Sequence, residues 1–184
     1  DKNNPLFKEA KPWEPRFDNL YANVIYDEEE EIYTCWYNPF IICQSTTDTP
    51  REEWWKYAYQ GRQAGTKREI GLCYATSEDG SRWMKPELGI VEFDGSKKNN
   101  LVIREAHGPS IVKDLREPDA ARRYKMFCTV LSPSNILSAA FSADGVHWSK
   151  TIPFPEAGGV GAVHQICFWA PALRKYVALT RLWG

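Results

Sequence analysis

One seven-residue pattern occurs twice in this chain, and it restricts the fold more than any other feature of the sequence. Residues 77–83 read SEDGSRW and residues 142–148 read SADGVHW, so both copies follow S-x-D-G-x-x-W. An Asp-Gly pair suits a tight turn, because glycine adopts positive φ without steric cost and aspartate accepts hydrogen bonds from N–H groups of its own turn. Since a strand-like run precedes each copy, the pattern predicts a repeated β-hairpin, with the tryptophan starting the return strand under the turn.

Three longer segments also resemble one another, and each reads as a strand, a polar turn, a tyrosine and a second strand. They span residues 23–37, 110–130 and 165–180. No segment shows helical periodicity of any length. Groups of four strands that repeat along a chain with hairpin connections are typical of β-propeller blades. We therefore predict an all-β fold that forms part of a β-propeller.

The repeats describe one partial propeller domain that spans the chain and holds about two and a half blades. Its predicted segments are an N-terminal arm (1–19), blade 1 (20–90), a connector (91–104), blade 2 (105–155) and the first half of blade 3 (156–184). A propeller of fewer than about four blades does not close into a ring. We therefore expect the open edge of the third blade to pair with the missing blades or with another chain.

Composition argues against several classes of partner. The formal net charge is −1, which gives no electrostatic basis for binding nucleic acid or an anionic membrane. No apolar run approaches the roughly 20 residues of a membrane-spanning helix. The five cysteines include no C-x-x-C spacing, so we expect small buried apolar residues rather than a zinc site or a disulfide framework. Aromatic residues make up 14% of the chain, which favours β structure and is also usual for carbohydrate-binding surfaces.

Several stretches resemble one known superfamily. They are GLCYATSEDGSRWMKPELGIVEFDGSKKNN (71–100), HGPSIVKD (107–114), RRYKMF (122–127), FSADGVHW (141–148) and HQICFWAPALRKYVALTR (164–181). Together they look like the five-bladed β-propeller glycoside hydrolases of families 32, 43 and 68, the superfamily of invertases, levanases and arabinanases. The resemblance implies a five-bladed propeller with its active site in a central funnel and a carbohydrate ligand. It also implies an extracellular or periplasmic protein, since members of the superfamily are often exported.

The resemblance further implies three carboxylates on or near the innermost strands of the first three blades. They would act as nucleophile or base, as transition-state stabiliser and as general acid. Carried over to this chain, the first is Asp18, a few residues ahead of the first predicted strand. The second falls on Gly108, in a His-Gly-Pro tripeptide where the superfamily carries Arg-Asp-Pro. The third blade offers no acid after Glu156.

Residues at the starts of the innermost strands would face such a funnel. The catalytic candidates among them are Asp18, His107 and His164. Imidazole suits this role because it transfers protons near neutral pH, and it also binds metals. The alternative is that each histidine hydrogen-bonds a loop. The spacing of these three residues does not by itself support a metal site, so we predict no metal and no cofactor.

Five further residues are candidates for substrate binding, namely Arg16, Trp54, Trp55, Gln165 and Arg181. Arg16 and Gln165 adjoin the catalytic candidates. Trp54 and Trp55 lie in an irregular insertion of blade 1, where indole rings either stack on sugar faces or pack the insertion onto the blade. Arg181 closes its strand, and a plain surface position is the alternative to ligand contact.

Two functions follow from these residues. The first is a glycosidase or related carbohydrate-active enzyme that cleaves glycans in the funnel, and the polar strand starts with their histidines favour it. The second is a non-catalytic carbohydrate-binding or assembly propeller that has lost its acids, and the missing second and third carboxylates favour it. Asp79 and Asp144, within the Asp-Gly turns, are predicted to be structural.

Overall fold

Strands make up nearly all of the regular structure. The computed structural model describes residues 4–17, 20–44, 49–53, 68–131, 135–157 and 163–181. The strands are β1 (Arg16–Phe17), β2 (Asn23–Asp27), β3 (Ile32–Tyr37), β4 (Pro39–Cys43), β5 (Arg68–Ser77), β6 (Leu101–Arg104), β7 (Ala106–Lys113), β8 (Tyr124–Val130), β9 (Ile136–Ser142), β10 (Ile152–Pro153), β11 (Ile166–Ala170) and β12 (Lys175–Leu179). Three short 3₁₀ turns accompany them, η1 (Arg51–Glu53), η2 (Ala120–Arg122) and η3 (Pro155–Ala157). The predicted all-β class is confirmed, and no helix in these ranges is long and apolar enough to cross a membrane.

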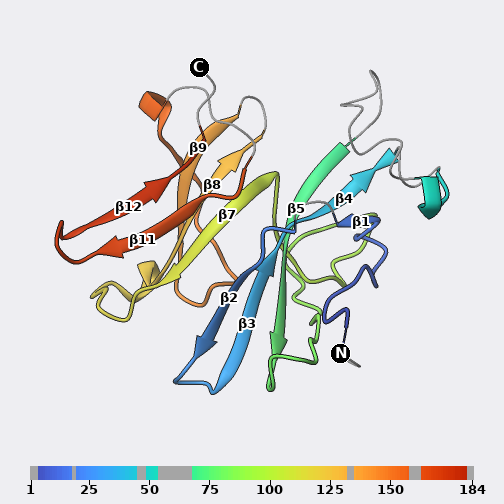
Figure 1. Cartoon of the computed structure of the whole chain (residues 1–184), viewed down its shortest axis with the longest axis horizontal. Coiled ribbons are helices and arrows are strands. Elements are labelled where there is room, and N and C mark those ends of the chain that lie inside the picture. Colours follow the sequence, from blue (N-terminus) through green and yellow to red (C-terminus); the bar gives the residue numbers. More distant parts are fainter. Residues whose placement is uncertain are drawn as a thin grey trace.

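The strands form three antiparallel sheets that follow one another along the chain (Figure 1). The first sheet has the order β1-β4-β5-β3-β2, and β6 also pairs with β5. The second is the four-stranded meander β10-β9-β8-β7, and the third is the hairpin β11-β12. Strand β2 lies beside β7, and β7 lies beside β11, so an edge strand of each sheet contacts the next sheet. This arrangement fits part of a β-propeller, whereas the number of blades in a complete ring stays a prediction.

Strands from outside the predicted first blade also join the first sheet. Strand β1 comes from the predicted N-terminal arm and pairs with β4, with Arg16 opposite Phe40. Strand β6 comes from the predicted connector and pairs with β5. Segments that read as polar or irregular in the sequence therefore complete the first sheet, and the blade boundaries themselves stay a prediction.

The two Asp-Gly turns form the same hydrogen bonds, as the repeated pattern predicts. Asp79 Oδ1 accepts the backbone N–H groups two and three residues further on, both at 2.8 Å. Asp144 Oδ1 accepts the equivalent pair at 2.9 and 2.8 Å. In both turns the serine two residues earlier donates its hydroxyl to the same carboxylate oxygen. The glycines that follow, Gly80 and Gly145, have φ of +70° and +75°. Both carboxylates are thus engaged within their own turns.

The stretch after each turn differs from the prediction of a full return strand. Thr76 forms only an isolated bridge with Met84, and Ser142 forms one with Trp148. Strand β10 is confined to Ile152–Pro153. Pro86 follows Met84 closely in the first copy, and Pro153 is the last residue of β10 in the second. A proline cannot donate a backbone hydrogen bond, and neither ladder extends past it. The turn tryptophans nevertheless pack against the cores, as expected.

Acid is expected to weaken the second Asp-Gly turn. Burial raises the pKa of the Asp144 carboxyl, but hydrogen bonds from the backbone and ring of His147, and from nearby groups, outweigh burial and lower the pKa from 3.8 to about 2. Because the pKa is lower in the folded state, the ionised carboxylate stabilises the fold above the unfolded pKa, and this contribution is lost as the pH falls from about 4 towards 2.

Urea unfolding at about pH 7 and about pH 3 checks this prediction. The Asp144→Asn variant lacks the titrating group, so it should lose less unfolding free energy on acidification than the wild-type chain. Equal losses in the two proteins would show that the Asp144 turn has no part in the acid response.

The larger core lies between the first and second sheets. Trp36 of the first sheet is fully buried there, together with Met126, Cys128 and Ala140 of the second. Trp36 Nε1 donates a hydrogen bond of 2.6 Å to the carbonyl of Gly145. The first sheet therefore packs directly onto the Asp-Gly turn of the second, and a single indole contributes both apolar contact and a buried hydrogen bond.

A buried ion pair holds the N-terminal arm against the first sheet. The Glu14 side chain is 0% exposed, and Lys85 Nζ donates to its two oxygens at 2.8 and 2.7 Å. The Tyr37 hydroxyl donates to the same carboxylate at 2.6 Å. Trp13 Nε1 donates to Asn100 Oδ1 at 2.7 Å. The arm thus covers much of the face of the first sheet that points away from the second sheet.

Candidate functional site

Three ring side chains meet where the edge strands β2, β7 and β11 begin, and we call them the strand-start cluster. Tyr21 lies two residues before β2, His107 is the second residue of β7, and His164 lies two residues before β11. The Tyr21 ring centroid is 5.2 Å from that of His107 and 5.4 Å from that of His164. His107 is buried and His164 is exposed. The structure therefore brings two of the three predicted catalytic residues together around a tyrosine.

Tyr21 stands on an unusual backbone. Leu20 and Tyr21 have φ of +47° and +46°, in the left-handed region that bulky side chains disfavour. Such residues persist when surrounding contacts over-determine them, and they cluster at functional sites. Here the Leu20 carbonyl accepts the Asn38 backbone N–H at 2.7 Å, and the Tyr21 carbonyl accepts Asn23 Nδ2 at 3.1 Å. Two asparagines thus hold the tyrosine in place.

The same two asparagines also fix strand β7. Asn38 Nδ2 donates to the Ala106 carbonyl at 2.9 Å, and Asn38 Oδ1 accepts the Gly108 N–H at 2.9 Å. Asn23 Nδ2 donates to the Pro109 carbonyl at 2.8 Å. The residues on both sides of His107 are therefore bonded to Asn38. The position of His107 relative to Tyr21 is set by these side chains rather than by a strand ladder.

Gly108 occupies the place where the resemblance implies a carboxylate, and the fold leaves no space for a side chain there. Its φ is +56°. A Cβ at this position would lie 1.9 Å from the Val163 carbonyl oxygen. The Gln165 N–H donates to the Gly108 carbonyl at 2.7 Å, so the segment before β11 is held close. The close approach of two backbones therefore explains the glycine.

The described substrate-binding candidates lie in three different settings. Gln165 is fully buried, and its Nε2 donates to Thr129 Oγ1 at 3.1 Å and to the Val163 carbonyl at 3.0 Å. Arg16 is also buried, on β1 at the opposite end of the sheet order from β2. Arg181 is exposed just beyond β12. Of these three, only Gln165 adjoins the strand-start cluster in sequence, and a role in substrate binding stays a prediction for all three.

Three other candidates, Asp18, Trp54 and Trp55, lie outside the described residues, so their predicted roles stay predictions. Among the residues that are described, no group of three histidine, cysteine, aspartate or glutamate side chains is arranged to hold a metal ion. Tyr21 and Asn38 lie just outside the first repeated segment and Asn23 is its first residue, and no motif in the sequence marks the contacts of these three residues. Their only signal is a position next to predicted strands.

A polar pocket of about 270 Å³ lies between the first two sheets, at the end away from the strand starts. Lys113 Nζ donates to both oxygens of Asp27, at 2.8 and 2.7 Å, and the Tyr124 hydroxyl donates to Asp27 at 3.3 Å. Burial raises the pKa of Asp27, but hydrogen bonds from Lys113 and from backbone N–H groups outweigh burial. The pKa of Asp27 therefore lies below its ordinary value. These charges are engaged in joining β2 to β7.

Solved structures include chains that are similar to this one, whereas the sequence comparisons found no match. No protein-family model matches the sequence. No curated protein matches it either. A crystal structure of an N-acetylgalactosamine deacetylase from F. plautii in complex with blood group B trisaccharide is similar at a TM-score of 0.49 and 14% sequence identity. The match covers 86% of this chain and 44% of that one, so this chain spans less than half of that protein.

Proposed function

We propose that the chain is part of a carbohydrate-active, propeller-like domain that acts on a glycan at the strand-start cluster. The observation that carries the proposal is the meeting of Tyr21, His107 and His164 at the starts of three edge strands. An aromatic ring offers an apolar face to a sugar, and an imidazole transfers protons near neutral pH. The resemblance to propeller glycoside hydrolases supports the same location.

Within this proposal the two histidines have different roles. His164 is exposed, so it is the group that exchanges protons with a bound glycan. His107 is buried beneath Tyr21 and positions the tyrosine ring. Asp18, if the resemblance holds at that position, supplies the carboxylate of the first strand start. Hydrolysis would then combine one carboxylate with an imidazole instead of using two carboxylates.

A second candidate function is carbohydrate binding without turnover. The observation that favours it is Gly108, because the Val163 backbone excludes a carboxylate from the place that the superfamily pattern gives to one. Asp79 and Asp144 do not substitute for it, since both are engaged in their own turns. In this second function the strand-start cluster recognises a glycan, and no bond is cleaved.

Turnover and binding assays separate the two candidates. The chain is incubated with a panel of oligosaccharides and aryl glycosides, alongside the variants His164→Asn, Asp18→Asn and His147→Asn. If His164 transfers a proton, its variant should lose about 10²–10⁴-fold in rate. His147 serves as the matched control, because it is a histidine 70% exposed in the second Asp-Gly turn, and its variant should keep full activity.

Each outcome of these assays has one interpretation. Turnover that falls in His164→Asn and not in His147→Asn supports the enzymatic proposal. Glycan binding without turnover, weakened by His164→Asn, supports the second candidate. If the chain neither binds nor cleaves any glycan in the panel, that result overturns a carbohydrate function for this chain.

A further inference from the structure

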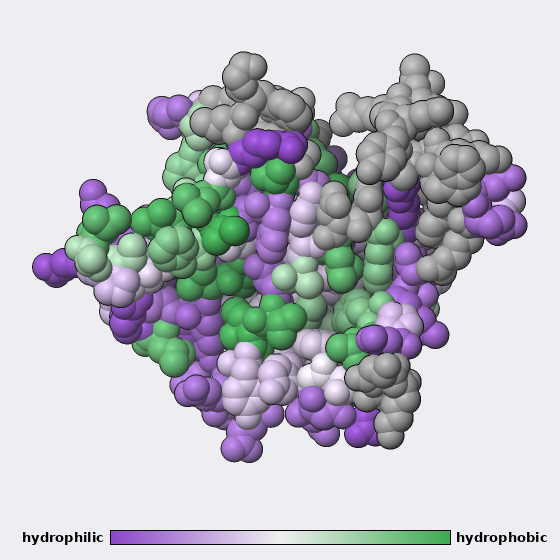
Figure 2. Space-filling view, in the orientation of Figure 1, coloured by the Kyte–Doolittle hydropathy of each residue, from purple (hydrophilic) through white to green (hydrophobic). Residues whose placement is uncertain are grey.

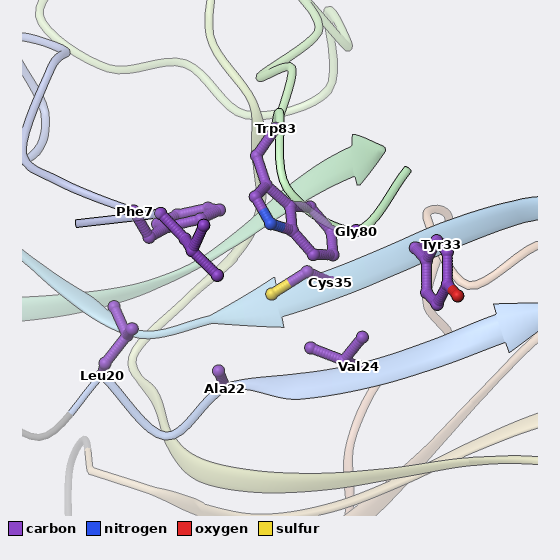
Figure 3. A pocket seen from close by; sticks show the side chains of 9 residues that line it. Phe7, Leu20, Ala22, Val24, Tyr33, Cys35, Gly80 and Trp83 are labelled. Atoms are coloured by element: carbon purple, nitrogen blue, oxygen red, sulfur yellow. The ribbon is translucent and has the colours of Figure 1, made fainter. Parts of the chain in front are cut away.

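The first sheet carries an apolar pocket on the face that points away from the second sheet. Its volume is about 330 Å³, and its lining includes Phe7, Val24, Tyr33, Gly80 and Trp83. Figure 3 shows Val24 and Tyr33 projecting from β2 and β3, while Phe7 and Trp83 approach from segments outside the sheet. Figure 2 shows hydrophobic residues at the surface over β2. Val24, the second residue of the edge strand β2, is 54% exposed, so the pocket leaves a large apolar side chain uncovered.

The internal repeat identifies the equivalent place on the second sheet. Val24 pairs with Cys35 across β2 and β3, and Ile111 pairs with Met126 across β7 and β8. Tyrosines stand two residues before Cys35 and before Met126 in the sequence, and the turn glycines Gly80 and Gly145 occupy the same place in the two patterns. The pocket on the first sheet is therefore the counterpart of the surface formed by Ile111, Met126, Tyr124 and Gly145.

On the second sheet this place is filled by Trp36 from the first sheet. The indole donates its N–H to the Gly145 carbonyl, and its ring centroid is 5.9 Å from that of Tyr124. A Cβ on Gly145 would lie 2.6 Å from the Trp36 ring, so the indole rests directly on the turn. Ile111 is accordingly only 7% exposed. The second sheet therefore shows that an Asp-Gly turn of this shape accommodates an indole ring.

On the first sheet, none of the described residues supplies a counterpart of the Trp36 indole. The three atoms nearest to a Cβ on Gly80 all belong to the Tyr33 ring, at 3.7 Å and beyond, so none of them is in close contact. The arm covers part of the face, because Phe7 contacts Trp83 and Tyr37, with ring centroids 5.8 and 4.6 Å apart. The remaining space lies beside Gly80, where the repeat places an indole. An apolar lining of this kind offers a sugar few hydrogen-bond partners, so the pocket suits a hydrophobic side chain better than a glycan.

We propose that this pocket is a seat for one large aromatic side chain, best a tryptophan, carried by a further antiparallel blade that packs on β2 and β3. The blade would lie on the first sheet as the first sheet lies on the second. The indole would rest on Gly80 and donate its N–H to the Gly80 carbonyl, as Trp36 does to Gly145. Val24 would then become as buried as Ile111, independently of any carbohydrate ligand.

The probe for this seat is 3-methylindole, the side chain of tryptophan, added to the 184-residue chain. Amide and methyl NMR spectra should show saturable shifts at Gly80 and Val24. The variant Val24→Trp places an indole in the seat, so probe affinity should fall at least about tenfold. The matched control Leu173→Trp adds the same side chain at a position 62% exposed in the turn between β11 and β12, and it should leave binding unchanged. Blocking the ring N–H, as in 1,3-dimethylindole, should weaken binding a few-fold.

Three results would overturn the proposal. Shifts that are unsaturable, or equal in Val24→Trp and wild type, would mean that the pocket is no seat for an indole. Saturable shifts at Gly80 from a disaccharide would assign the pocket to a glycan. Sedimentation of the wild-type chain as a dimer that Val24→Trp abolishes would make a second copy of the chain the occupant. We expect a monomer, which leaves the separate blade as the occupant.

Discussion

Replacing Gly108 by alanine is expected to destabilise the chain by more than about 4 kcal/mol, a loss that few single substitutions reach. The added Cβ would lie 1.9 Å from the Val163 carbonyl oxygen and 2.8 Å from its carbonyl carbon. Both are backbone atoms, so neither can swing aside as a flexible side chain would. The φ of +56° adds strain for any residue other than glycine. Urea unfolding followed by tryptophan fluorescence measures the loss.

Gly95→Ala is the matched control for this prediction. Gly95 has a similar φ of +75°, but a Cβ there would meet no atom within 4 Å. Its substitution should therefore cost only the backbone strain, about 1–3 kcal/mol. The difference between the two variants isolates the close approach between β7 and the segment before β11. Equal losses in both variants would mean that this approach does not constrain Gly108.

The same contact with Val163 excludes larger side chains at residue 108. A single Gly108→Asp change would meet the same contact, so it cannot restore the carboxylate of the superfamily pattern. The segment from Val163 to Gln165 would have to move first. With the backbone in this position, residue 108 therefore has no space for a carboxylate side chain.

Removing the positive charge of Lys85 is the second change with a large expected effect. The variant Lys85→Met leaves the Glu14 carboxylate, which is 0% exposed, without its cation. An uncompensated buried charge costs about 3–5 kcal/mol, so we expect a loss of that size in urea unfolding. The arm should also become more susceptible to proteolysis, because Glu14 bonds both Lys85 and Tyr37.

Two further variants make the Lys85 prediction specific. Adding Glu14→Gln to Lys85→Met removes the stranded charge, so the double variant should be more stable than Lys85→Met alone. Arg82→Met breaks an ion pair with Asp79 in which the arginine side chain is 90% exposed, and it should leave stability nearly unchanged because solvent screens the pair. A double variant less stable than the single one would show that the carboxylate is not stranded when Lys85 is removed.

The sequence predicted the parts of the fold that depend on local chemistry. Asp79 and Asp144 bond the N–H groups of their own turns, and such bonds need only residues two or three positions away. The hairpins β2-β3, β7-β8 and β11-β12 follow from alternating strands joined by polar turns. The return strands are shorter than the repeated pattern predicts, and a proline lies at or soon after the end of each one.

The candidate site was predicted only in part, because its contacts join residues far apart in the chain. His107 and His164 were singled out from the resemblance, whereas Tyr21 between them was not. Asn38 bonds residues on β5 and β7, and nothing in its local sequence marks it. Glu14 belongs to a charged, proline-rich arm, and no feature of the sequence predicts its burial beside Lys85. Buried polar networks of this kind depend on tertiary packing.

The cysteines provide a way to follow the opening of each sheet separately. All five are free: Cys35, Cys43 and Cys73 lie in the first sheet, Cys128 in the second and Cys167 in the third. Burial raises the pKa of Cys35 and of Cys128 to about 12, and alkylating reagents attack the thiolate. The four buried thiols should therefore react only after their own strands open, whereas Cys167 is partly exposed and should react first. Timed alkylation read by mass spectrometry would give the order in which the sheets open, without any introduced label.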